Sequence, residues 1–200
     1  MLPSAPEATF PEPAAAAPGV KLEDVLTAAE SPSENTSLLI EALRSGDAAE
    51  TRCLAAALLG ECDGNDPLVT GALEESGGST DDVCLLLAVV DSQLQHSTVN
   101  SSTAANLVKL LPGCEPAVQV QGLTTLRHFS GMSCREECVQ LLTGLLESAH
   151  ADVRVAAALT LSDFRPLPAE AVSRLEKLSA EDASEEVRES AAASLARGVK

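Results

Sequence analysis

The sequence is poor in aromatic and basic residues. It has three Phe, no Trp and no Tyr among 200 residues, and 13 Lys and Arg stand against 30 Asp and Glu, for a formal net charge of −17. Proteins that bind nucleic acids attract phosphates with basic side chains and stack bases on aromatic ones. Because both kinds of residue are scarce, the composition predicts a protein that does not bind nucleic acid.

Long apolar runs and targeting signals are also missing. The longest uninterrupted apolar run covers residues 83–90, whereas a membrane-spanning helix needs roughly 18 apolar residues. No basic amphipathic face that would bind a membrane surface is apparent. The N-terminus does not combine a positively charged start with an apolar core, as a secretion signal does. We therefore expect a cytoplasmic protein that does not associate with membranes.

The six cysteines are expected to be free thiols, because disulfide frameworks belong to secreted proteins. Cys53 and Cys84 lie inside apolar runs, which favours positions in the core. Cys134 and Cys138 are four residues apart and could share a helix face. No His or second Cys pair stands near them at the spacing of a zinc site, so the sequence predicts neither a metal nor another cofactor.

The residues that are abundant favour helices. Hydrophobic residues make up 45% of the chain, supplied mainly by Ala, Leu and Val, and this composition predicts an all-α protein. Six of the eleven prolines fall within residues 1–33, which are expected to form a disordered tail before a folded domain at 34–200. A short helix over 21–30, anchored by Val25 and Leu26, either reflects local propensity alone or docks on the domain.

A pattern of small and apolar residues recurs along the domain. The clearest copies begin at Thr51, Val153 and Val187, each followed by arginine and then by a pair of alanines and a leucine. Weaker copies begin at 83 and 118, so the spacings are 32, 35, 35 and 34 residues. Another helix-like segment precedes each copy, beginning near residues 36, 67, 103, 136 and 168. The pattern predicts an α-solenoid of about five antiparallel helix pairs that stack to bury a shared core.

The copies resemble HEAT repeats, including the class named after phycobilisome lyases. The resemblance is carried by Asp152-Val153-Arg154 with Ala157, Ala158 and Leu161, and by Glu186-Val187-Arg188 with Ala191, Ala192 and Leu195. It extends over residues 35–198 and weakens in the second and third pairs, where Cys84 and Gln119 replace the arginine. It implies a solenoid of the HEAT and armadillo type.

Charged residues at repeated positions are interpreted first as structural. Arg52, Arg154 and Arg188 occupy equivalent places, so stacking should set them in one row, bonded to carboxylates or turn carbonyls. Asp182 precedes Arg188 by six residues, the spacing of the Asp–Arg pair typical of HEAT repeats. Acidic residues open the second helices and favour the helix dipole: Glu50, Asp82, Asp152 and Glu186. We call Arg52, Arg154, Asp182 and Arg188 the ladder. These residues are predicted to stabilise the fold rather than to bind a ligand.

Function is predicted from what remains. None of His96, His128 and His150 is followed by Glu, unlike the His–Glu pairs of the HEAT-like iron hydroxylases, and no catalytic residues are predicted. The leading hypothesis is a non-catalytic scaffold or adaptor that binds a protein partner. Residues 1–100 hold 17 acidic and 3 basic residues, which predicts a partner with a basic surface.

Two further hypotheses concern enzymatic activity and assembly. The alternative to a scaffold is a lyase-like or maturation factor of the phycobilisome-lyase class, which would need a deep pocket between adjacent pairs. The last helix carries Glu185, Glu189 and Arg197. The other hypothesis is a structural adaptor that stacks end to end with a second copy or another solenoid, but these residues suit a polar cap, and we expect a monomer.

Overall fold

The computed structural model describes residues 19–197, and these form helices joined by short turns, without strands. The α-helices are α1 (Leu22–Ala28), α2 (Thr36–Ser45), α3 (Ala49–Leu59), α4 (Pro67–Ser79), α5 (Val83–Gln95), α6 (Ser101–Leu110), α7 (Pro116–Leu126), α8 (Arg135–Leu145), α9 (Ala151–Leu161), α10 (Ala169–Glu181) and α11 (Glu185–Ala196). Three short 3-10 segments, η1 (Pro32–Glu34), η2 (Leu111–Gly113) and η3 (Arg127–Phe129), lie between them.

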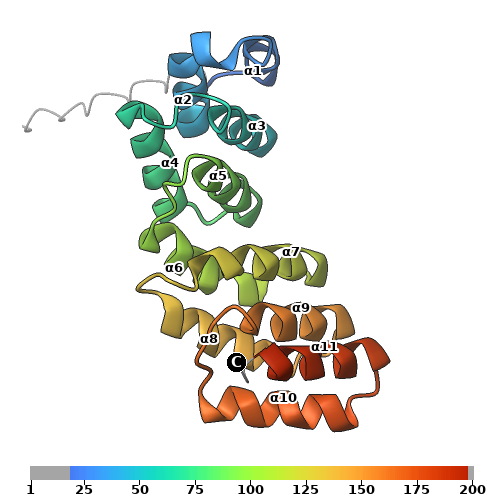
Figure 1. The fold of residues 1–200 in the computed structure, drawn as a ribbon. Helices are drawn as coiled ribbons and strands as arrows, with labels where there is room; N and C mark the ends of the chain where they lie inside the picture. The colour runs from blue at the N-terminus through green and yellow to red at the C-terminus, as the bar shows by residue number, and fades with distance from the viewer. Residues whose placement is uncertain (1–18, 198–200) are drawn as a thin grey trace, which may run out of the picture.

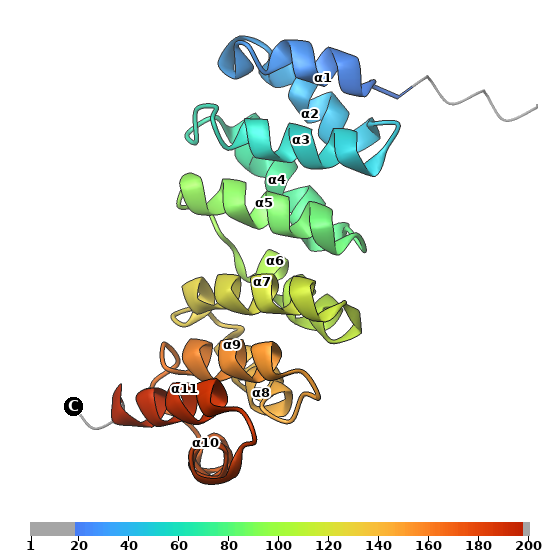
Figure 2. The ribbon, with the colours of Figure 1, turned by 90° about the vertical axis from the view of Figure 1, so that its right-hand side faces the viewer.

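Helices α2 to α11 form five consecutive pairs that stack into an elongated solenoid. The first helices α4, α6 and α8 follow one side of the stack, and the second helices α5, α7 and α9 follow the other (Figure 1). Viewed from the second-helix side, α3, α5, α7, α9 and α11 lie one below another (Figure 2). The predicted all-α solenoid is confirmed.

Local sequence signals explain where several helices begin. Pro67 and Pro116 occupy the first positions of α4 and α7, where proline lacks only an N–H that would be unpaired in any case. The side chain of Asp66 accepts a hydrogen bond from the Leu68 N–H, and that of Asn100 accepts one from the Thr103 N–H. These caps satisfy backbone donors that the first turn leaves free.

The repeat pattern of the second pair begins two residues later than predicted, because Asp82 is the N-cap of α5. Its carboxylate caps α5 by accepting hydrogen bonds from the N–H groups of Cys84 and Leu85. Counted from the N-cap, the buried position that opens the repeat pattern is therefore Leu85 rather than Val83, and the arginine position belongs to Leu86 rather than Cys84. The equivalent residues in all five second helices are Thr51, Leu85, Val118, Val153 and Val187, which makes the period more regular than predicted.

The chain before the first pair is partly helical, contrary to the prediction of a disordered tail over 1–33. Helix α1 packs against α2 and α3, which agrees with the alternative of a short helix over 21–30 that docks on the domain, so the prediction of disorder is wrong for residues 22–33; residues 1–18 lie outside the described residues. Val25 anchors α1 with no exposed surface, but Leu26 is 56% exposed. Ala28 takes the second anchoring place because residues three apart share a helix face.

The buried side chains form two clusters that meet in α5. The first runs from α1 to Leu85 and Val89 of α5. The second begins with Leu86, Leu87 and Val90 of the same helix and continues to α11. Helix α3 packs along α5, α7 along α9 and α9 along α11, whereas α5 packs on α6 and lies farther from α7 (Figure 2). The second-helix stack is therefore less close between the second and third pairs.

Gln93 is a polar residue in an apolar position. It occupies the place held by Leu59, Leu126 and Leu161 in other second helices; it is 1% exposed, and its side-chain oxygen has no hydrogen-bond partner among the described residues. We expect Gln93→Leu to raise the free energy of unfolding by about 1–2 kcal/mol, since an unpaired buried acceptor is removed. Urea denaturation would measure it. Gln95→Leu, on the exposed side of α5, is the control, and equal effects of the two changes would contradict this reason.

Candidate functional site

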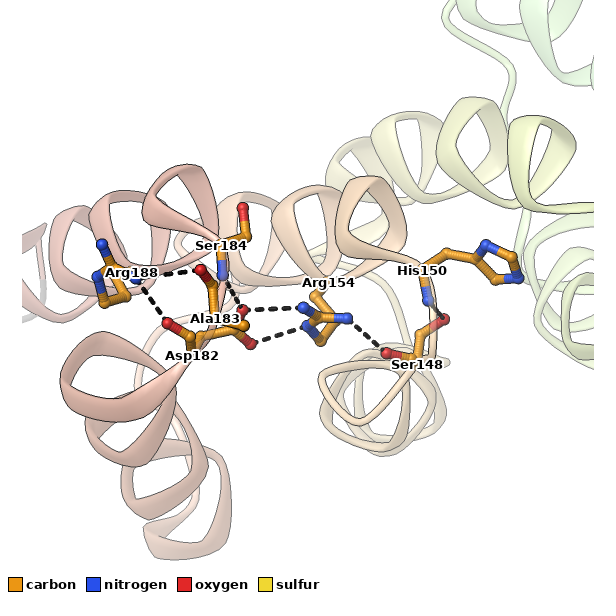
Figure 3. A network of polar contacts seen from close by, with 7 residues as sticks. All are labelled: Ser148, His150, Arg154, Asp182, Ala183, Ser184 and Arg188. Carbon is orange, nitrogen blue, oxygen red and sulfur yellow. Dashed lines mark hydrogen bonds and ion pairs between the residues drawn. The ribbon is translucent and has the colours of Figure 1, made fainter.

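The best-defined polar cluster joins the fourth and fifth pairs at their turns. The Arg154 guanidinium, on α9, donates from Nε to Asp182 Oδ2 at 2.9 Å and from Nη2 to Asp182 Oδ1 at 2.8 Å. Its Nη1 donates to the Ser148 carbonyl at 2.8 Å. Figure 3 shows the guanidinium lying between the turn of its own pair and the carboxylate of the next. The arginine therefore fastens the two pairs together.

Asp182 follows α10 and serves both pairs. The hydrogen bonds from Arg154 outweigh partial desolvation and hold the pKa of its carboxyl below the usual range. Its Oδ1 also accepts the Ser184 N–H at 2.9 Å, at the start of α11. The Asp182 side chain is 6% exposed and that of Arg154 15%. This near-buried bidentate pair is of the kind whose disruption is costly.

The structure changes the partner of Asp182. Spacing suggested Arg188, but the carboxylate binds Arg154 of the preceding pair, while Arg188 Nη1 donates to the backbone carbonyls of Asp182 at 2.6 Å and Ala183 at 3.4 Å. Arg188 stands on the same pair as Asp182, so its side chain reaches the carbonyls that α10 leaves unpaired at its end. The arginine at the equivalent position one pair earlier, Arg154, binds the carboxylate instead.

The same carbonyl contact recurs at the third pair without an arginine. Gln119 Nε2 donates to the carbonyls of Leu111 at 3.2 Å and Pro112 at 3.3 Å. A glutamine thus replaces the arginine and keeps its contact with the turn. In the second pair Leu86 has no donor, and Asn106 of α6 bonds the carbonyls of Gly77 at 3.0 Å and Thr80 at 2.8 Å instead. Sequence comparison of the second helices could not reveal Asn106, because it lies on a first helix.

Arg52 differs from the other ladder arginines. The residue equivalent to Asp182 in the second pair is Thr80, so the bidentate partner of Arg52 is missing. Arg52 lines a hollow of about 480 Å³ together with Glu75, Thr80 and Asp81. Of Arg52, Arg154 and Arg188, only Arg154 forms an ion pair with the next helix pair in the described residues.

The comparison with known families agrees with this architecture. A family model described as HEAT repeats matches residues 104–196. The family match identifies HEAT repeats in this part of the chain. The match covers the last three helix pairs, which include the Arg154–Asp182 contact. The first two pairs are described as HEAT-like from their structure and not from the family match. No curated protein matches the chain.

A groove of about 630 Å³ lies between α8 and α10. Arg135 holds one wall by donating to the carbonyls of Phe164 at 3.0 Å and Pro166 at 2.8 Å. Arg174 bridges the helices, with Glu170 at 2.7 Å and Glu147 at 3.1 Å. The carboxyls of Glu136 and Glu170 are the acidic groups in the lining, so the groove is lined by two arginines and two glutamates.

The cysteines stand as free thiols in mixed environments. Cys62, Cys134 and Cys138 are buried, and Cys53 and Cys114 are partly exposed. Cys84 is exposed, so the prediction of a core position for it is wrong. Burial raises the pKa of Cys138 to about 12, which keeps this thiol protonated at neutral pH. Within residues 19–197, no cluster of His, Cys, Asp or Glu could hold a metal ion, and no helix is long and apolar enough to cross a membrane.

Acidic side chains crowd the surface of the first two pairs and α1. Among residues 19–100, thirteen Asp and Glu are exposed: Glu23, Asp24, Glu30, Glu34, Glu41, Asp47, Glu50, Glu61, Asp63, Glu74, Glu75, Asp81 and Asp91. Lys21 pairs with Glu23 at 3.5 Å and Arg44 with Glu75 at 2.9 Å. Most of this negative charge is therefore not neutralised by a neighbouring base.

Proposed function

We propose that this protein is a non-catalytic scaffold whose N-terminal half binds a protein partner through a basic surface on that partner. Stacked repeats provide an extended surface that suits protein binding. The observation that carries the proposal is the excess of exposed, unpaired carboxylates in residues 19–100. Such a surface accelerates the encounter with an oppositely charged protein and disfavours a negatively charged one.

We also propose that the protein is a cytoplasmic monomer. The buried thiols of Cys62, Cys134 and Cys138 suit a reducing compartment. Glu185 and Glu189 are exposed on α11, where the matching residues of α9 are Ala151 and Val155. Charges at these places disfavour stacking of a second solenoid on this end of the molecule.

The lyase-like alternative would use the groove between α8 and α10, which lies between adjacent pairs as that reading requires. We favour the scaffold because Arg135 and Arg174, the cations that line the groove, are already bonded to backbone carbonyls and carboxylates of the protein.

Affinity purification from cell extract at low and high salt tests the proposal. We expect the captured proteins to be enriched in basic ones and to elute as salt rises, because contacts between exposed charges are screened beyond about 10 Å at 0.1 M salt. A variant with Glu41→Gln, Glu74→Gln and Asp81→Asn should lose them. The matched control is Glu136→Gln, Glu137→Gln and Glu176→Gln, which neutralises exposed acids of the C-terminal half. Partners that withstand salt, or that both variants retain equally, would overturn the electrostatic part.

A further inference from the structure

The junction between the second and third pairs differs from the other junctions on the second-helix side. Ser92 Oγ on α5 donates to the Ala56 carbonyl of α3 at 2.6 Å, and Thr160 Oγ1 on α9 donates to the Leu123 carbonyl of α7 at 3.1 Å. These bonds tie successive second helices together. The equivalent Thr125 of α7 donates to the Gln121 carbonyl of its own helix at 3.1 Å, and no such bond joins α7 to α5 in the described residues. The Oγ of the equivalent Ser194 of α11 has no partner among the described residues either, but there Arg197 Nη1 joins α11 to the end of α9 by donating to Ser162 Oγ at 2.9 Å.

Side-chain size explains why α5 and α7 stay apart. The face of α5 that joins the cluster of the third pair carries Val83, Leu87, Val90 and Leu94. The equivalent residues of α3, which packs closely on α5, are Ala49, Cys53, Ala56 and Gly60. Small residues let helices approach, and bulky ones hold them apart. The side chains on this face of α5 are therefore too bulky for α7 to approach α5 as closely as α3 does.

Helix α7 adds bulk from the other side. Gln121 stands where α5, α9 and α11 have Ala88, Ala156 and Ser190. The Ala156 and Ser190 side chains are buried, but Gln121 is exposed. Its exposure confirms that this face of α7 is not covered by α5.

On the first-helix side the same junction is tight. A Cβ placed on Gly77 of α4 would lie 2.5 Å from Thr103 Oγ1 of α6, and one placed on Gly78 would lie 2.7 Å from Ser102 Oγ. Asn106 of α6 also ties the end of α4 through the carbonyls of Gly77 and Thr80. The two halves of the solenoid are thus joined closely at α4 and α6 and loosely at α5 and α7.

We infer that this junction is a hinge: residues 19–95 and 101–197 bend as two blocks about the α4–α6 contact, opening and closing between α5 and α7. The first buried cluster lies wholly within residues 19–95, and the second lies within 101–197 except for Leu86, Leu87 and Val90 of α5. Bending therefore leaves the packing within each block unchanged and alters the contacts of this α5 face. Hinges of this kind absorb a domain motion in a few residues between rigid parts. The motion would alter the angle between the acidic half and the rest of the scaffold.

Pulsed electron spin resonance on the full chain tests the hinge. Nitroxide labels on Ala57→Cys and Thr124→Cys report α3 to α7 across the junction, and labels on Thr124→Cys and Ala193→Cys report α7 to α11. Both pairs span two steps of the stack, and all three positions are exposed. The partly or fully accessible thiols are removed by Cys53→Ser, Cys84→Ser and Cys114→Ser, with the fold checked by circular dichroism.

The distance distribution across the junction should be about twofold wider than that within the C-terminal block, because one interval contains a moving joint and the other does not. Distributions of equal width would overturn the hinge. Adding Gln121→Ala, an exposed site whose truncation spares the core, should shorten the mean distance across the junction. An unchanged mean distance would overturn the role given to Gln121.

Discussion

Asp182→Ala is expected to lower the free energy of unfolding by about 3 kcal/mol, because it leaves the Arg154 guanidinium partly buried without its carboxylate. The change removes both hydrogen bonds from Arg154, at 2.9 and 2.8 Å, and the bond from the Ser184 N–H. The fourth and fifth pairs lose the contact that fastens their turns together. Chemical denaturation followed by circular dichroism would measure the loss.

The matched control for this change is Glu186→Ala, an exposed acid in the first turn of α11. Its removal should cost well under 1 kcal/mol, the typical scale for a surface charge near a helix start. A double-mutant cycle with Arg154→Ala isolates the interaction between the two side chains. A coupling energy near zero would show that the ion pair does not fasten the repeats.

The same pair predicts how stability depends on pH. The folded-state pKa of Asp182 is lowered by Arg154, whereas the unfolded carboxyl titrates at its ordinary value of about 3.9. The stabilisation is therefore fully present above that value and is lost as pH falls through it toward the folded pKa. The difference in unfolding free energy between wild type and Asp182→Asn should shrink from pH 7 to pH 3. A constant difference would contradict the assignment.

Gly77→Ala is expected to destabilise the protein by about 1–3 kcal/mol, the usual cost of adding a methyl group where there is no room. The new Cβ would lie 2.5 Å from Thr103 Oγ1 and 3.1 Å from Val89 Cγ1. Both neighbours are fully buried, so neither can move aside easily. Thermal unfolding of the full chain would record the loss as a lower melting temperature.

Gly71→Ala provides the opposite result on the same helix. A Cβ at Gly71 meets no atom within 4 Å, so the substitution adds helix propensity without a clash and should stabilise by roughly 0.5–1 kcal/mol. If both alanines raised stability, the close approach of α4 and α6 at Gly77 would be refuted.

Periodicity predicted the fold well because the buried positions of a solenoid recur at a nearly fixed interval along the chain. Val153, Ala157 and Leu161 are all fully buried on one face of α9, as their spacing of four residues requires. The second pair was predicted two residues out of register for a local reason. Asp82 caps α5 through two backbone N–H groups, while matching by small and apolar residues alone aligned Val83 with Val153.

The candidate site was only partly predictable, because residues at equivalent positions of successive pairs contact different partners. Arg52, Arg154 and Arg188 take equivalent places in their second helices, yet of the three Arg154 alone binds a carboxylate. The reason is that the pair after Arg154 carries Asp182, whereas the pair after Arg52 carries Thr80 at the equivalent position. Asn106 performs the same carbonyl bonding from a first helix. No comparison of like positions in the second helices would have found it.

The helices and their pairing follow from the amino-acid sequence alone, because caps, propensity and a period near 34 residues act over short stretches of chain. The tertiary structure alone decided which residues meet across pairs and where the stack opens. The distance between α5 and α7 depends on the combined bulk of Leu87, Leu94 and Gln121, which lie on different helices. Such a spacing is set only when the two faces are brought together.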